Sequence, residues 1–248
     1  MKTKTKNWLL ATSVGTFVMA FLAVTAEAQT MSMDPAGHEP LIGHVLVDEF
    51  EYRVQDGNDV LSTEMQAWYG GDYNKVWLEF RGESQISESV EEAEVQLLYT
   101  RLIGYYWDFQ GGVRYDIKPD PSRAYGQFGF QGLAPGYFEV DVKGFVSEEG
   151  DLSARFEAEY DLYVTQRLVL QPALEVNFAA QSVPELGIGS GVNDIELGLR
   201  LRYEVFREFA PYVGINYERK FAETADFARE EGEDTSSFQY VAGIRFWF

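Results

Sequence analysis

The sequence predicts an all-β fold, a transmembrane antiparallel up-and-down β-barrel of about twelve strands, with ten as the alternative count. Three observations predict it. Segments of about ten residues alternate between apolar and charged residues, which is typical of strands with one apolar face. Aromatic residues gather at the ends of these segments. The chain finishes on an alternating aromatic run, whereas no apolar run after residue 28 is long enough for a membrane-spanning helix.

Residues 1–28 are expected to be a signal peptide. Three lysines within the first six residues precede an uncharged apolar stretch over residues 8–24. Ala26 and Ala28 supply the small side chains that a signal peptidase requires, so cleavage is expected before Gln29. An uncleaved membrane anchor is the alternative, but no basic stop-transfer cluster follows the apolar stretch. Residues 29–43 are then a flexible leader, and residues 44–248 form the barrel.

The alternation is clearest between residues 152 and 162. Every second residue there is apolar, and the residues between them are Ser153, Arg155, Glu157, Glu159 and Asp161. A helix would distribute these charges around its whole circumference, so the pattern favours a strand. In chain order, the expected strands are 44–53, 63–70, 75–83, 93–102, 107–116, 124–133, 137–146, 152–162, 168–178, 195–203, 211–219 and 239–248, with poor alternation in the first two.

The connections between these strands alternate between long and short. The short ones fall at 71–74, 104–106, 134–136, 164–167 and 204–209. Bacterial barrels have short periplasmic turns and longer extracellular loops. If the C-terminus is periplasmic, every short connection lies on the periplasmic side, and an even strand count places the N-terminus there too. The sequence therefore predicts that both termini are periplasmic. The acidic run at 229–234 is expected to be charge on a long loop.

Two architectures fit strands with one apolar and one charged face. A soluble β-sandwich would bury the apolar face between two sheets, whereas an outer-membrane barrel turns it towards lipid and encloses the charged face. Interfacial aromatic girdles favour the barrel, and the residues expected in them are Tyr99, Tyr105, Tyr106, Trp107, Tyr115, Tyr137, Tyr160, Tyr203, Tyr212 and Tyr217.

The C-terminal run also favours the barrel. Tyr240, Ala242, Ile244, Phe246 and Phe248 alternate up to the last residue. This resembles the signal by which outer-membrane barrels are recognised for insertion. A last strand that pairs with the first leaves no free sheet edge, which explains why the chain ends on a strand.

Composition excludes some classes of partner. The chain carries 40 acidic and 20 basic residues, and signal-peptide cleavage leaves a net charge of about −22. This argues against nucleic acid, which requires clustered Lys and Arg. An exported chain without cysteine has no disulfides and must be held together otherwise, for example by a closed sheet.

Over residues 41–248 the chain resembles the copper resistance protein B family of outer-membrane proteins. The resemblance is carried by stretches in order along the chain, among them WYGGDYNKVWL (68–78), AEVQLLYTR (93–101), GGVRYDIKPDPSR (111–123), FVSEEGDLSARFEAEYDL (145–162) and REFAPYVGINYERKF (207–221). It implies a copper-tolerance role in the outer membrane of a Gram-negative bacterium, beside a periplasmic multicopper oxidase. Family members often carry a long N-terminal extension rich in Met, His and Asp, whereas here that extension is reduced to residues 29–44.

That short segment supplies most of the soft or imidazole donors of the mature chain. They are Met31, Met33, His38 and His44, with Met65 further on. Thioethers suit Cu(I), and imidazoles suit Cu(II). We therefore expect copper ions to bind here, at the periplasmic mouth of the barrel. A leader with incidental Met and His residues is the alternative.

The enclosed face is a second candidate site, because acids outnumber bases on it. The acids expected to form a cation path are Glu94, Asp108, Glu157, Glu159, Asp161 and Glu196. The alternative is that these acids form ion pairs with Arg and Lys and fill the narrow lumen of a twelve-stranded barrel.

Enzymatic activity is not expected. The mature chain has two histidines, His38 and His44, and neither lies near the outer rim where a catalytic base would be needed. The function expected from the sequence is outer-membrane copper resistance, with copper bound at the mouth and moved across the membrane. A general passive porin without metal specificity is the alternative.

Overall fold

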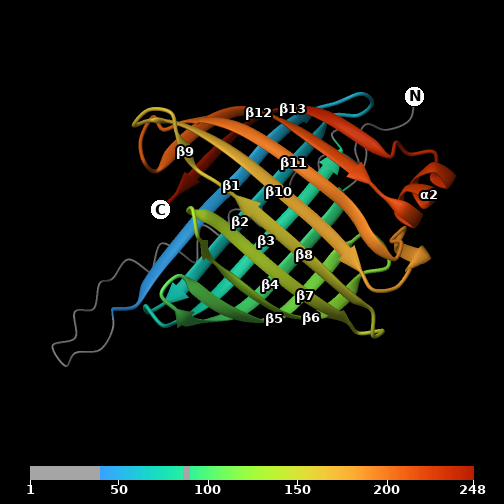
Figure 1. Ribbon diagram of the computed structural model, residues 1–248, viewed down its shortest axis with the longest axis horizontal. Helices are drawn as coiled ribbons and strands as arrows, with labels where there is room; N and C mark the ends of the chain where they lie inside the picture. The colour runs from blue at the N-terminus through green and yellow to red at the C-terminus, as the bar shows by residue number, and fades with distance from the viewer. Residues whose placement is uncertain (1–39, 86–89) are drawn as a thin grey trace, which may run out of the picture.

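The computed structural model describes residues 40–85 and 90–248. Nearly all of this part of the chain is a single antiparallel sheet closed on itself (Figure 1). Its strands are β1 (Ile42–Val54), β2 (Val60–Gly70), β3 (Asn74–Gln85), β4 (Val90–Gly104), β5 (Trp107–Lys118), β6 (Arg123–Ala134), β7 (Phe138–Ser147), β8 (Leu152–Glu159), β9 (Leu162–Tyr163), β10 (Leu168–Ala179), β11 (Gly191–Tyr203), β12 (Phe209–Lys220) and β13 (Ser236–Trp247).

The thirteen strands of the described residues make a twelve-stranded barrel, because β8 and the two-residue β9 lie end to end and count as one strand. Both pair with β10, through Glu159 opposite Ala173 and Leu162 opposite Leu170. Pro172 lies at the break between them and has no N–H to donate to the neighbouring strand. The twelve-stranded prediction is confirmed, and each strand lies within a few residues of its expected position.

The first and last strands close the barrel. β1 pairs with β13 from Leu46 opposite Trp247 to Val54 opposite Tyr240. Val45 and Phe248 exchange two backbone hydrogen bonds of 3.0 Å. The cylinder therefore has no free sheet edge, and a two-sheet sandwich is excluded.

The two rims of the barrel differ. The start of β1, the end of β13 and the connections 71–73, 105–106, 135–137, 164–167 and 204–208 lie at one end, called here the terminal rim (Figure 1). The long connections lie at the other end, the far rim, where a 3-10 turn, η1 (Pro184–Leu186), and a helix, α2 (Ala222–Glu231), are found. The alternation of short and long connections holds only in part: the far-rim connections 119–122 and 148–151 are as short as 164–167 at the terminal rim, and the expected 220–238 loop contains α2. In the described part of the chain, no helix is long and apolar enough to cross a membrane.

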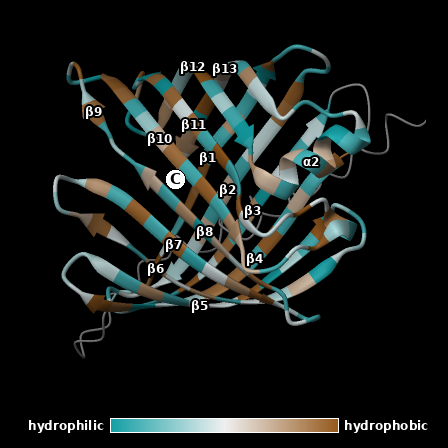
Figure 2. Cartoon of the chain, turned by 45° about the vertical axis from the view of Figure 1, so that its right-hand side comes forward, coloured by the Kyte–Doolittle hydropathy of each residue, from teal (hydrophilic) through white to brown (hydrophobic). Residues whose placement is uncertain are grey.

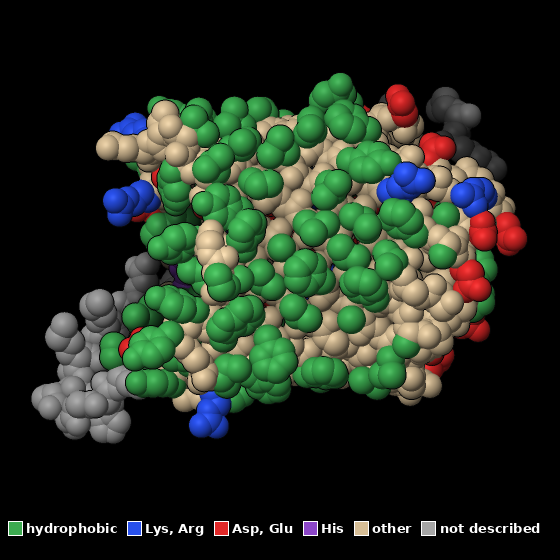
Figure 3. Space-filling view, viewed as in Figure 1, with side chains coloured by type: hydrophobic (Ala, Val, Ile, Leu, Met, Phe, Trp, Pro, Cys, Tyr) green, Lys and Arg blue, Asp and Glu red, His purple; other side chains and the backbone are tan. Residues whose placement is uncertain are grey.

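Alternation along each strand separates the two faces of the wall (Figure 2). Large apolar side chains are exposed on the outside, for example Val113 at 58% and Val213 at 59%. Figure 3 shows them covering the wall, with acidic side chains gathered at the far rim. The charged residues of the same strands point inward and are paired or buried. The outside therefore suits lipid, as expected.

One expected girdle residue is placed differently. Tyr212 is 6% exposed and lies on the inner face, opposite Arg202 and Gly243. A Cβ on Gly243 would lie 2.6 Å from the Tyr212 ring, so the ring occupies the space that a side chain there would need. The prediction that Tyr212 belongs to an interfacial girdle is wrong. Tyr105 and Tyr137, at 97% and 76% exposed, lie in the turns of the terminal rim.

Candidate functional site

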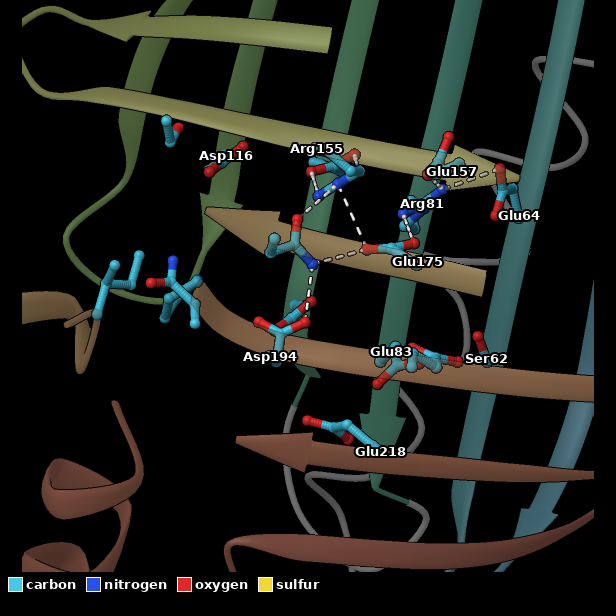
Figure 4. Close-up of a pocket in the computed structure, with 18 of the residues that line it drawn as sticks. Ser62, Glu64, Arg81, Glu83, Asp116, Arg155, Glu157, Glu175, Asp194 and Glu218 are labelled. Carbon is cyan, nitrogen blue, oxygen red and sulfur yellow. Dashed lines mark hydrogen bonds and ion pairs between the residues drawn. The ribbon is translucent and has the colours of Figure 1, made fainter. Parts of the chain in front are cut away.

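The centre of the lumen is crossed by ion pairs between opposite walls. Arg81 on β3 contacts Glu157 on β8 at 2.7 Å and Glu175 on β10 at 2.9 Å (Figure 4). β3 and β8 lie five strands apart in a twelve-stranded barrel, so the Arg81 side chain spans the lumen. Arg81 also contacts Glu64 on β2 at 3.2 Å. We call this group the Arg81 crossbeam.

A second set of pairs lies beside it, centred on Glu94 of β4. Arg114 contacts Glu94 at 2.7 Å, and Arg155 reaches it from β8 at 3.1 Å. Phe145, 3% exposed, lies between the two guanidinium groups, 4.9 Å from Arg114 and 5.9 Å from Arg155. These cation–π contacts hold the arginines in place. Arg155 also contacts Glu175 at 3.4 Å, which joins this set to the Arg81 crossbeam.

A third group of ion pairs, which we call the Lys143 crossbeam, lies nearer the terminal rim. Lys143 on β7, 4% exposed, reaches across to Glu79 on β3 at 2.9 Å and contacts Asp141 at 3.2 Å. On the wall that runs from β11 through β12 and β13 to β1, Arg200 contacts Glu49 at 2.5 Å and Glu51 at 2.6 Å, and Glu51 is fully buried. The side chains that would line an open pore are thus engaged with one another.

The expected lumen acids all lie on the inner face, and most are already paired. Glu94 and Glu157 belong to the groups described above. Asp161 pairs with Arg202 at 2.7 Å, Glu196 lies 3.5 Å from Arg53, and Asp108 lies 4.0 Å from Lys75. Glu159 accepts a hydrogen bond of 2.8 Å from Gln171 and has no ion-pair partner among the described residues. The expected ion-pair filling of the lumen is present, and a cation path stays a prediction.

The sequence analysis missed three inward-pointing charges on β1: Glu49, Glu51 and Arg53. The reason is a bulge, because the register with β2 shifts between Val47 and Glu49. Asp48 and Glu49 both reach inner-face partners, Arg245 at 2.6 Å and Arg200 at 2.5 Å. A bulge places two successive residues opposite one, so strict alternation fails there. The charged sequence DEFEYR (48–53) is the signal that indicates these inward-pointing charges.

The terminal mouth has a different lining, made of aromatic rings. His44 on β1 lies between two indoles, with ring centroids 5.8 Å from Trp68 and 5.5 Å from Trp247. Trp77 continues the cluster at 6.1 Å from Trp68, and the Lys75 ammonium lies 5.1 Å from the Trp68 ring centroid. The Trp247 indole donates a 2.8 Å hydrogen bond to the Arg207 carbonyl, which fixes that ring. We call these rings the aromatic mouth.

His44 is oriented by these rings but has no hydrogen-bond partner. Within the described residues, neither imidazole nitrogen makes a hydrogen bond, and the side chain is only half-buried. It lies two residues from the start of β1, close to the rim. An imidazole that is fixed in orientation and has its nitrogens available is suited to bind a late transition metal.

The other expected donors do not join His44 in the structure. Met31, Met33 and His38 lie outside the described residues, as do the signal peptide and most of the 29–43 leader. Met65 is 2% exposed and pairs with Val47 and Phe80 on the outward side of the wall, opposite in direction to Glu64. The structure therefore places Met65 and His44 on opposite faces. In the described part of the chain, no three His, Cys, Asp or Glu side chains are grouped so that they could hold a metal ion.

Two cavities flank the crossbeams. A cavity of about 380 Å³ extends from the Arg81 crossbeam to the far rim, where Thr224 of α2 and Leu186 of η1 line it. A smaller one of about 150 Å³ lies at the terminal rim, beside Trp247, Arg245 and Asp161. The larger cavity is lined by twelve carboxylates and eight basic side chains. Its excess of negative charge favours cations.

A closed cylinder of twelve antiparallel strands, apolar outside and charged inside, is an outer-membrane β-barrel. Solved porins share the fold. The NanC porin superposes with a TM-score of 0.53 at 14% identity, over 82% of this chain and 98% of that one. The KdgM porin in complex with disordered oligogalacturonate gives a TM-score of 0.51 at 11% identity, over 83% and 98%. At this level of identity the similarity shows the fold alone.

The chain belongs to the copper resistance protein B family. The family described as "Copper resistance protein B precursor (CopB)" matches residues 41–248. Copper resistance protein B of Escherichia coli is 43% identical over 212 residues, covering 85% of this chain and 71% of that protein. The copper resistance protein B homolog of Pseudomonas syringae pv. tomato is 41% identical over 212 residues, covering 85% and 72%. The resemblance seen in the sequence is confirmed, and the protein is located in the outer membrane.

Proposed function

We propose that this barrel contributes to copper tolerance by binding copper ions at its aromatic mouth. Membership of the copper resistance protein B family supports the copper-tolerance role. One observation of the structure carries the binding step: His44 is held between Trp68 and Trp247, with no hydrogen-bond partner on either nitrogen among the described residues. Copper is the cargo of the protein in this proposal.

The leader supplies the remaining donors. Met31, Met33 and His38 precede His44 by 13, 11 and 6 residues in the sequence, and we propose that they donate to the same copper ion. A thioether-rich set suits Cu(I), and added imidazoles extend the range to Cu(II). Met65 is not part of this proposed site, because it lies on the outward face of the wall. Glu159 and the other lumen acids are proposed to attract cations rather than to coordinate them.

The terminal rim is proposed to face the periplasm. The two longest connections in the described chain, 180–190 and 221–235, lie at the opposite rim, and barrels of this class have short periplasmic turns and longer extracellular loops. The aromatic mouth would then open towards the compartment where a multicopper oxidase could receive or deliver copper. We propose transport across the outer membrane as the second step and no enzymatic activity, since His44 is at the rim and has no nucleophile or acid as a hydrogen-bond partner within the described residues.

Copper tolerance of a deletion strain tests the proposal. The strain is complemented with the wild-type gene, with His44→Ala, or with Arg167→Ala, a change in an exposed turn at the same rim. We expect wild type and Arg167→Ala to restore growth in copper, and His44→Ala to fail despite normal amounts of folded barrel in the outer membrane. If His44→Ala restores full tolerance, the mouth is not the copper site. If no variant affects tolerance and the purified barrel conducts all small solutes equally, the passive-porin function is supported instead.

A further inference from the structure

On the β3, β4 and β7 side of the lumen, a layer of side chains lies between the two cavities and lines neither of them. This layer, called the septum, contains Trp77, Glu79, Gln96, Leu98, Asp141 and Lys143. Trp77 and Leu98 are 9% and 1% exposed, and Lys143 is 4% exposed. The septum lies between the 380 Å³ cavity of the far half and the 150 Å³ cavity of the terminal rim. A solute that crosses the barrel on this side has to pass through it.

The Lys143 crossbeam is the part of the septum that links distant strands. Lys143 leaves β7 and ends at Glu79 on β3, four strands away. Its flexible four-carbon stem can adopt other rotamers, whereas the arginines beside Phe145 are held by stacked rings. The link between the two walls is therefore made by one side chain that no aromatic ring stacks against, and its ammonium is held by Glu79 and Asp141.

Several polar atoms of the inner face have no partner. Gln96 Oε1, Gln127 Oε1, Gln127 Nε2 and Asp141 Oδ1 are buried without a hydrogen bond among the described residues. Buried polar groups normally find a partner in the protein or in water, so these atoms are places where water can enter the lumen. These amide and carboxylate groups would be hydrated if the layer opened, so they fit a passage that is closed in this state and wet in another.

Charge sets what such a passage would admit. The larger cavity has four more carboxylates than basic side chains, so removing Lys143 makes the lumen still more negative. We propose that the barrel is a closed channel for small hydrated cations, and that the Lys143–Glu79 pair is its gate. This goes beyond copper capture at the mouth and does not depend on it, since the gate acts on potassium as well as on copper.

Planar-bilayer recording in a KCl gradient tests this proposal. Wild-type barrels should give few or no conducting steps, whereas Lys143→Ala should give discrete steps, a severalfold rise in current, with a reversal potential on the cation-selective side. Lys143→Arg should stay closed, because the longer cationic side chain can still reach Glu79. Lys118→Ala is the matched control: it removes the same charge at the far rim, outside the septum, and should stay closed.

Two further readings keep the test decisive. Heat-modifiable gel mobility shows whether each variant is folded. Glu79→Gln weakens the Lys143–Glu79 pair without changing the volume of the side chain. This variant should open more often than wild type, and it tests the gate even if Lys143→Ala does not fold. Wild-type currents as large as those of the variants would overturn the gate. Folded Lys143→Ala and Glu79→Gln barrels that stay silent would also overturn it, and anion-selective currents would overturn the cation channel.

Discussion

The central crossbeams and the aromatic mouth use their polar groups in opposite ways. In the crossbeams, the carboxylates contact guanidinium or ammonium groups, most of them on another strand, as Glu157 and Glu175 contact Arg81. In the mouth, His44 is fixed by rings and has no hydrogen-bond partner among the described residues. Groups that satisfy one another stabilise the barrel, whereas an oriented but unsatisfied group can bind a ligand. On this comparison, we propose stability and closure for the centre and metal capture for the rim.

The largest expected effect is on the stability of the centre. Arg81→Ala would leave Glu64, Glu157 and Glu175 without their shared partner in a largely enclosed lumen. Breaking a buried ion pair from one side costs about 3–5 kcal/mol, because the remaining charges are uncompensated. We expect the free energy of unfolding in urea, measured in detergent micelles, to fall by about that amount. Arg167→Ala, in an exposed turn, should change it by less than about 0.5 kcal/mol. A loss no larger than that of Arg167→Ala would show that the crossbeam does not stabilise the fold.

A smaller effect is expected at the mouth. Trp68→Leu removes one of the two rings that orient His44 and leaves the imidazole in place. Loss of a group that orients a metal ligand typically weakens metal affinity about 10–100-fold, and we expect the lower end of this range for copper. Isothermal titration of the purified full-length mature protein measures this. Trp107→Leu, at the outward-facing start of β5, is the control and should bind like wild type. Equal affinities for the two variants would mean that the ring cluster does not position His44.

The sequence predicted the wall well because the wall depends on local alternation. Each predicted strand is present, since a two-residue period with one apolar face is specified residue by residue. β1 alternated poorly for a physical reason, the bulge between Val47 and Glu49. Tyr212 was misplaced because an aromatic residue near a strand end fits a girdle. Its alternation with Val213 and Ile215, and the missing side chain of Gly243 opposite it, are the signals of the inner face.

Contacts across the lumen could not be predicted in the same way. Arg81 and Glu175 are 94 residues apart, and their meeting depends on the stagger and tilt of twelve strands. The helix α2 was also missed, because a long loop was expected there. Its signals were present in the sequence: Thr224, Ala225 and Ala228 form one buried face, and Gly232 ends the helix in a left-handed conformation. The mouth cluster brings His44 next to Trp247 only because the last strand returns to the first.

The smallest expected effect concerns the far rim, where α2 is tied to the preceding loop. Ser190 donates hydrogen bonds of 3.2 Å and 3.3 Å from its backbone N–H and hydroxyl to Glu223, and these bonds lower the pKa of Glu223 below its ordinary value of 4.5. A lowered folded-state pKa stabilises the docked helix above pH 4.5, and this contribution is lost as the pH falls through the lowered value.

Hydrogen-exchange protection factors of the α2 amides measure this tether. They should fall between neutral pH and a pH below 4.5 in wild type, and Glu223→Gln should show reduced protection with a weaker pH dependence. Glu230→Gln, on the exposed side of the same helix, should behave like wild type. A pH response of Glu223→Gln equal to that of wild type would assign the effect to other groups.

The most direct test of the contrast between rim and centre is a copper titration of three mature proteins side by side: wild type, His44→Ala and Glu159→Gln. Glu159 is the expected lumen acid that has no ion-pair partner among the described residues, so it is the strongest competitor within the centre. We predict that His44→Ala lowers copper affinity at least about tenfold, a loss no smaller than the one expected for Trp68→Leu. Glu159→Gln should leave the copper affinity unchanged. Unchanged affinity for His44→Ala together with a loss for Glu159→Gln would contradict the account and move the copper site into the lumen.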